Sequence, residues 1–333
     1  MSYINTTNLI PIPLEIDNNH KDYSIAIAII VLGIVASLVV FVRLAYRYST
    51  KRLGIDDYAM IPAVMFYIAW TAMAAYFNLH SGIGKPIEEI TYGEFIIFFK
   101  GIFVAAWMYP LMSASIRVSI LLFYRRIFAK GYLFYSSTIW ILLALQGAYV
   151  IAFEIIPGFS CHPIADAWDP VNRITNCSDL YINATEALYS TSLAFDVILL
   201  IFPIYAISRL QMPLKKRLGV FVIFILGAAA GIVAAYKLRI FVYETTHWEP
   251  TDPSWWNFEA AAYNLPQYND YGKTFWIPSQ VEPTVAMIGT SLPALLQLYA
   301  SASLQFSKIC SHHDRKRVQQ WWLKCIRQRQ SEI

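Results

Sequence analysis

The chain has 333 residues, of which 57% are hydrophobic and only 14% are charged, whereas about a quarter of the residues in a soluble domain carry a charge. This composition argues against a soluble enzyme, because so much apolar surface would aggregate in water. The net charge of +4 is small and implies no nucleic-acid partner. We therefore predict a membrane protein whose main partner is the lipid bilayer.

A transmembrane helix needs about 20 mostly apolar residues, because it rises about 1.5 Å per residue across a hydrocarbon core of about 30 Å. Segments of this kind recur along the chain, and none shows the alternation of a β-strand. They predict an all-α bundle of seven transmembrane helices over residues 24–305, between an N-terminal segment 1–23 and a basic tail 306–333. In chain order the predicted spans are Ser24–Val42, Tyr58–Leu79, Phe95–Phe123, Tyr132–Phe153, Ala187–Ile207, Leu218–Tyr236 and Pro283–Leu304.

Lys and Arg are distributed unevenly between the predicted spans. Loops rich in these residues remain on the cytosolic side of a membrane. We therefore predict an external N-terminus and a cytosolic C-terminus, in the plasma membrane or an endomembrane. The two sides carry 18 and 4 basic residues, in segments 43–57, 125–132, 208–217 and 301–333 on one side and 1–23, 80–94, 160–185 and 244–281 on the other.

Three N-x-S/T sequons provide an independent check on this topology. They begin at Asn5, Asn176 and Asn183, and all three fall on the predicted external side. Each sequon is a common short match, but their agreement favours the predicted orientation. We expect a glycoprotein, with Asn183 as the sequon closest to the membrane.

Cys161 and Cys177 lie in one predicted external loop, which faces an oxidising compartment. A disulfide between them would constrain the unfolded loop by roughly 3 kcal/mol in the chain-entropy model. The sequence has neither a Cys-x-x-Cys motif nor the Cys/His spacing of a zinc site. We therefore predict a structural bridge rather than a metal or redox centre.

The tail shows the period of an amphipathic helix with basic residues around its apolar side. This pattern predicts a helix on the anionic inner leaflet. Cys325, on the apolar side, is either a palmitoylation site or an unmodified buried thiol. The apolar positions are Val318, Trp321, Trp322, Cys325 and Ile326.

Ionisable side chains inside predicted spans are candidates for function, because a charge in lipid is costly. Asp196 lies near the midplane, and helix geometry places Arg117 at a depth from which its long side chain reaches Asp196. Such a pair either fixes the helix register or belongs to a switch. A second set nearer the external side either lines a pocket or extends to the membrane surface, and comprises Lys100, Glu154, Lys237, Arg239 and Glu282.

The sixth predicted span contains a GxxxG motif, formed by Gly227 and Gly231. This motif indicates either close packing inside the bundle or a dimer face. Pro203 and Pro293 lie inside spans, where proline favours a kink that helps to open a cavity.

The positions of the histidines and lysines limit which cofactors the bundle could hold. None of the six histidines lies in the middle of a span, which argues against a b-type haem and an intramembrane zinc hydrolase. The last span has no lysine, so a retinal Schiff base of the rhodopsin type has no amine there. The motifs HExxH, GxSxG and GxxxxGK(S/T) are absent as well, so we expect no metal, no cofactor and no motif-type catalytic residue.

An ordered series of short motifs along residues 24–305 resembles the fungal rhodopsin-domain membrane proteins. This family includes the Pth-eleven-like receptor candidates and the satratoxin-cluster membrane proteins. Where family members usually have lysine, this chain has Arg117. The matching motifs are Asp56-Asp57-Tyr58, Gly82-Ile83-Gly84, the stretch 117–128, Cys161 with Pro163, Trp168 and Cys177, Asp196 with Pro203, Gln211-Met212-Pro213, Arg239, and Glu282 with Pro293.

The resemblance implies a rhodopsin-like bundle but neither retinal nor a G protein. It also implies a link to secondary metabolism, because many family members are encoded beside natural-product enzymes. We expect a receptor-like protein that binds a small apolar or amphipathic molecule from outside and acts on a cytosolic signalling protein. The first alternative is a membrane-embedded enzyme or accessory protein that acts on a lipophilic natural product, with Asp196, Glu154 or Glu282 as general acid. A carrier or exporter is the third hypothesis.

Overall fold

The computed structural model describes residues 21–85, 91–128, 133–169, 176–178, 180–209, 214–246 and 275–299, together with positions 172, 301 and 303. Helices account for most of these residues, and no strand occurs among them. The prediction of an all-α fold is therefore confirmed. Asn5 and the predicted tail helix lie outside the described residues.

Within this described part, six helices are long and apolar enough to cross a membrane. A seventh long helix covers residues 277–299, after a π-helical turn at 275–276, and is called the last helix below. The seven helices follow the order of the predicted spans, so the chain is a multi-pass membrane protein. The first six are α1 (Ser24–Ser49), α2 (Ile55–His80), α3 (Tyr92–Phe128), α4 (Leu133–Ile155), α6 (Leu180–Arg209) and α7 (Leu214–Thr246).

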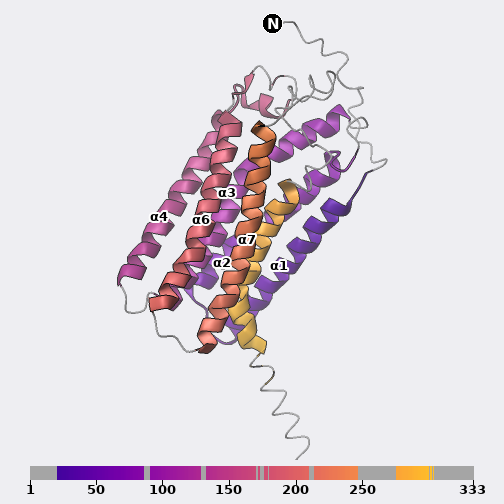
Figure 1. The fold of residues 1–333 in the computed structure, drawn as a ribbon. Coiled ribbons are helices and arrows are strands. Elements are labelled where there is room, and N and C mark those ends of the chain that lie inside the picture. The colour runs from indigo at the N-terminus through magenta and orange to yellow at the C-terminus, as the bar shows by residue number, and fades with distance from the viewer. Residues whose placement is uncertain are drawn as a thin grey trace, which may run out of the picture.

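The helices lie side by side in one bundle, with α7 between α6 and the yellow-orange last helix (Figure 1). Two short 3-10 helices, η3 (Ile156–Phe159) and η4 (Ile164–Trp168), follow α4 at one end of the bundle. The same segment holds the Cys161–Cys177 disulfide, which confirms the predicted bridge. We call this end of the bundle the disulfide end.

Most of the helices have one side toward their neighbours and one side of large apolar residues facing outward, whereas α3 exposes no large apolar residue among its described side chains. On α1 the outward side includes Ile27, Val31 and Leu38, each more than half exposed in the isolated chain. Gly33 lies on the buried side, where its backbone approaches Thr71 of α2 so closely that a Cβ atom would clash. A bilayer covers such an outward apolar surface and leaves close packing to hold the helices together.

The last helix begins earlier than predicted, because hydropathy places the start of this span at Pro283. The residues before Pro283 lower the hydropathy of the segment, yet they are buried inside the bundle. Gln280, for example, is fully buried and donates hydrogen bonds to Tyr67 at 3.0 Å and to Thr71 at 2.9 Å. Glu282 consequently lies within the helix rather than at its margin.

The GxxxG motif of α7 is used only in part for packing between the described helices. An added Cβ at Gly227 would lie 3.3 Å from Leu200 of α6, whereas one at Gly231 would meet nothing within 4 Å. Close packing inside the bundle therefore accounts for Gly227. Both α6 and the last helix continue beyond their internal prolines, Pro203 and Pro293.

The orientation of the bundle in the membrane stays a prediction from the charge asymmetry. A reporter fused after Ile333 is expected in the cytosol, because 18 of the basic residues lie on that side. Endoglycosidase is expected to increase the gel mobility of the intact protein through the external sequons. A C-terminal reporter accessible only from outside intact cells would reverse the assignment.

Candidate functional site

Four charged side chains from four helices meet inside the bundle. Arg117 of α3 donates a hydrogen bond to Asp196 of α6, with 2.9 Å between Nε and Oδ1. Lys237 of α7 donates to Glu282 of the last helix, with 2.8 Å between Nζ and Oε2. The two pairs are adjacent, because Arg117 Nη2 lies 3.8 Å from Glu282 Oε1. We call Arg117, Asp196, Lys237 and Glu282 the four-charge network.

The network confirms one sequence-based expectation and corrects another. The predicted Arg117–Asp196 pair is present. Depth along the helices predicts a separate outer level for Lys237 and Glu282, at which each residue either lines a pocket or extends to the membrane surface. The separation into two levels is wrong, because Glu282 lies 3.8 Å from Arg117. Of the two alternatives for Lys237, extension to the membrane surface is excluded, because its side chain is only 3% exposed and is paired with Glu282.

Hydroxyl and aromatic groups complete the coordination of the network. Tyr109 of α3 donates to Glu282 Oε1 at 2.7 Å and accepts from Lys237 Nζ at 2.8 Å. Arg117 also donates to the hydroxyl of Ser192, one turn before Asp196 on α6. The Lys237 ammonium lies 4.1 Å from the ring centre of Tyr109 and 4.6 Å from that of Tyr189, which is cation–π geometry. No sequence signal distinguished Tyr109, Ser192 or Tyr189 from other apolar or polar residues of their helices.

The charge balance explains how the bundle tolerates this group. Two cations and two carboxylates add to zero net charge, so neither helix pair carries an uncompensated ion into the low-dielectric interior. Each carboxylate accepts hydrogen bonds, as burial of a charge requires. Asp196 is the most exposed member at 16%, and its second oxygen, Oδ2, has no hydrogen-bond partner among the described residues.

A second buried ionic group lies away from the disulfide end, where α1 ends and α2 begins. Arg43 and Arg47 of α1 each contact both Asp56 and Asp57 of α2, at 2.7–3.1 Å. Arg126 of α3 completes this arginine–aspartate cluster, at 2.9 Å from Asp56. Except for Arg126, these side chains are at most 9% exposed. The cluster therefore ties three helices together.

The last helix also joins this arginine–aspartate cluster. Arg43 Nη1 donates to the backbone carbonyl of Thr290, which has a hydroxyl bonded to the Met287 carbonyl. Glu282 and Thr290 are eight positions apart in one helix, which corresponds to about 12 Å of helix rise. The last helix therefore contacts the four-charge network through Glu282 and the arginine–aspartate cluster through Thr290.

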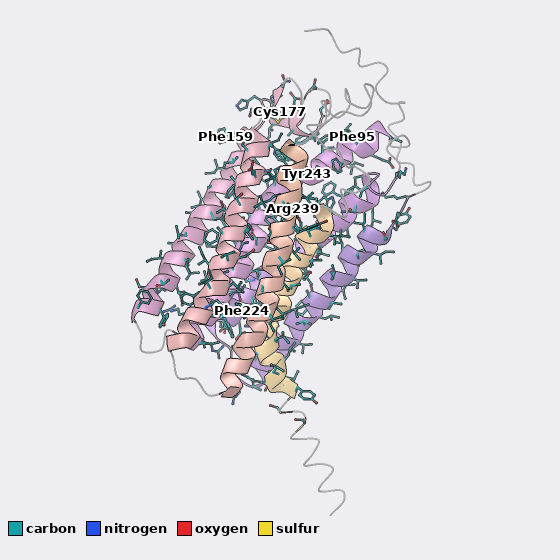
Figure 2. The ribbon with its side chains drawn as sticks, viewed as in Figure 1. Phe95, Phe159, Cys177, Phe224, Arg239 and Tyr243 are labelled. Carbon is teal, nitrogen blue, oxygen red and sulfur yellow. A yellow bond between two sulfur atoms is a disulfide. The ribbon has the colours of Figure 1, made fainter. Side chains whose placement is uncertain are left out.

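The remaining predicted site residues lie outside both groups. Lys100 and Arg239 are exposed, and Figure 2 labels Arg239 on α7. Glu154 of α4 is half-buried, and its Oε1 atom has no hydrogen-bond partner among the described residues. The structure therefore brings together Arg117, Asp196 and Glu282 but not the other ligand-pocket candidates of the sequence, which are Lys100, Glu154 and Arg239.

The sequence model of one protein family, the fungal rhodopsin domain, matches residues 42–301, which is most of the chain. The chain belongs to this family. The match includes the four-charge network and the arginine–aspartate cluster, so both lie within the fungal rhodopsin domain rather than in an addition to it. No solved structure matches the chain.

Relatives of this fungal rhodopsin-domain protein include two that are named for biosynthesis clusters. Wortmanamides biosynthesis cluster protein C of Talaromyces wortmannii is 28% identical over 65% of the chain and 58% of the relative. Satratoxin biosynthesis SC1 cluster protein 4 of Stachybotrys chartarum is 27% identical over 48% of the chain and 56% of the relative. A SAT4 family membrane protein of Emericella nidulans is 30% identical over 43% of the chain and 37% of the relative. The aligned part therefore covers less than two thirds of each relative.

Proposed function

We propose that this fungal rhodopsin-domain protein is a receptor-like membrane protein that binds a small apolar or amphipathic molecule within its bundle. The names of its relatives support a role in secondary metabolism, since two of the three described above refer to biosynthesis clusters. A receptor needs a ligand site, a second surface that reports binding, and an element that couples the two.

The main support for this proposal is the position of the last helix, which contacts both the four-charge network and the arginine–aspartate cluster. Glu282 holds it in the four-charge network, and the Thr290 carbonyl holds it to Arg43 in the arginine–aspartate cluster. Because a helix moves as a stiff unit, a ligand that shifts the network also displaces an acceptor of the cluster. Buried ion pairs have discrete alternative partners, which suits a two-state element better than a continuously deformable one.

The proposed orientation makes the cluster end cytosolic, as the distribution of Lys and Arg favours. The basic loop 208–217 and the tail would then present the response to a cytosolic signalling protein. The disulfide end would face outward, and the ligand would enter on that side or from the membrane.

The proposal predicts that ligand binding changes the spacing of helices at the cluster end. Spin labels at Leu53 and Phe134, both exposed at this end, would report the distance between the α1–α2 turn and α4 in a Cys310→Ser, Cys325→Ser background. Lipophilic fungal metabolites that raise the unfolding temperature of nanodisc-embedded protein are expected to shift this distance distribution. Labels at Ile151 and Phe159, both on the α4–η3 segment, provide a control pair that stays unchanged.

The enzyme hypothesis has one specific observation in its favour: Asp196 lines a cavity, and its Oδ2 atom has no partner in the part of the chain that the structure describes. Glu282 is less suited to proton transfer, because both of its oxygens already accept hydrogen bonds. Mass spectrometry of the same incubations separates the two functions. Conversion of a bound metabolite without any distance change would replace the receptor proposal with the enzyme one.

A further inference from the structure

A cavity of about 60 Å³ lies beside Asp196, on the side of the network away from the disulfide end. α3, α6, α7 and the last helix all contribute to its wall, and it is partly open to the outside of the bundle. A smaller cavity of about 30 Å³ adjoins it and is lined by Arg117, Asp196 and Glu282. The main cavity, called the Asp196 cavity, is lined mostly by apolar or small residues, among them Ile120, Leu199, Phe224, Ala230, Ala286 and Gly289.

The polar groups of the Asp196 cavity leave one strong acceptor for a bound molecule. The Tyr124 hydroxyl donates to the Leu199 carbonyl at 3.3 Å, and the Thr290 hydroxyl donates to the Met287 carbonyl at 3.0 Å. Asp196 Oδ1 accepts from Arg117, but Oδ2 is buried and has no partner among the described residues. A buried carboxylate oxygen without a donor is costly, so a donor that reaches it gains the interaction at little further desolvation cost.

The charge of the network determines what kind of donor fits. Asp196 is already balanced by Arg117, and Glu282 by Lys237, so a cationic ligand would add an uncompensated charge to the bundle interior. An anionic ligand would face an unpaired carboxylate oxygen. A neutral hydroxyl or amide N–H satisfies Oδ2 without changing the charge, and the apolar wall accommodates a hydrocarbon group beside it.

We propose that the Asp196 cavity binds the neutral hydroxyl- or amide-bearing end of an apolar chain, which donates a hydrogen bond to Asp196 Oδ2. This inference deepens the proposed function and rests on it for its biological meaning. It also places the ligand against the segment 285–290 of the last helix, next to the Thr290 carbonyl that Arg43 holds.

Small side chains provide the space, which makes the site testable by filling it. Ala230 of α7 is 6% exposed and lines both cavities. Leucine at this position would occupy the volume without changing any charge. Gly231, the next residue, lines neither cavity, and a Cβ atom added there would meet nothing within 4 Å. Gly231→Leu is therefore a matched control on the same turn of α7.

The experiment compares three probes of similar size on nanodisc-embedded protein: 1-butanol, methyl propyl ether and butylammonium. The shift of the unfolding temperature is titrated for the wild type, Ala230→Leu and Gly231→Leu. Effects of the alcohol on the bilayer are common to all variants, so the difference in unfolding-temperature shift between variants reports binding in the cavity. The wild type and Gly231→Leu are expected to bind 1-butanol about tenfold more tightly than the ether. Butylammonium is expected to show no variant-dependent shift.

Several outcomes would overturn the inference. Equal binding of alcohol and ether would remove Asp196 as the acceptor, and equal shifts in all variants would mean that the cavity holds water alone. If Ala230→Leu does not fold, Ala286→Val tests the same volume. A metabolite that shifts the spin-label distance equally in wild type and Ala230→Leu would sustain the receptor proposal and refute this site. Selective 1-butanol binding without any metabolite-induced change of the spin-label distance would support this site and refute the receptor proposal.

Discussion

Glu282→Gln is expected to lower the stability of the bundle by about 3–5 kcal/mol, because it leaves Lys237 buried without a counter-ion. The lysine is 3% exposed, and Glu282 is the carboxylate that it contacts. The substitution also weakens the acceptor for Tyr109 and removes the second negative charge near Arg117. Thermal unfolding in detergent, followed by intrinsic tryptophan fluorescence, measures the loss together with the yield of folded protein.

The companion variants show whether the ion pair causes this loss. Glu154→Gln is the matched control, because Glu154 is a half-buried carboxyl outside the network, and only a small effect is expected. The double variant Glu282→Gln, Lys237→Met removes both charges and is expected to be more stable than Glu282→Gln alone. A double variant whose loss equals the sum of the two single losses would show that these charges are not coupled.

The sequence predicted the spans well because hydropathy measures what a helix presents to lipid. All seven predicted segments correspond to helices, and the Arg117–Asp196 pair followed from depth along two helices. The disulfide followed from two cysteines in one loop. These inferences need only the position of each residue along its own helix or loop.

The Lys237–Glu282 pair required information that no single helix contains. Lys237 lies toward one end of α7, where a long side chain facing lipid would extend to the membrane surface. Its actual orientation is toward Tyr109 and Tyr189 in the interior, which depends on how α7 packs between α6 and the last helix. Rotation of a helix about its axis is set by tertiary packing, and the weak amphipathicity of α7 gave no guide to it.

The arginine–aspartate cluster was missed for a related reason. Arg43 and Arg47 were counted as loop charges in the topology argument, whereas both belong to α1 and are buried. Asp56 and Asp57 entered only as a family motif at the start of α2. A charge count treats each basic residue as solvated, and it does not detect acidic partners that neutralise two of them a few residues later.

Asp196→Asn is expected to leave most of the protein folded and to abolish the preference of the Asp196 cavity for a hydrogen-bond donor. The asparagine carbonyl can replace Oδ1 as the acceptor for Arg117, whose charge also lies 3.8 Å from Glu282. The amide N–H₂ then occupies the position of Oδ2 and presents a donor where the ligand also offers one. Arg117→Gln is expected to be more destabilising, by about 3 kcal/mol, because it leaves the Asp196 carboxylate without its counter-ion.

Unfolding temperatures and the 1-butanol titration for Asp196→Asn, Arg117→Gln and the double variant separate a structural role from a ligand-binding one. If the pair serves structure alone, the two substitutions are strongly coupled in stability, and the folded Asp196→Asn protein still prefers alcohol to ether. If Asp196 is the ligand acceptor, this preference disappears while the Asp196→Asn protein remains folded. The structure favours the second result, because Arg117 occupies Oδ1 of Asp196, Oδ2 has no partner among the described residues, and Asp196 lines an apolar cavity.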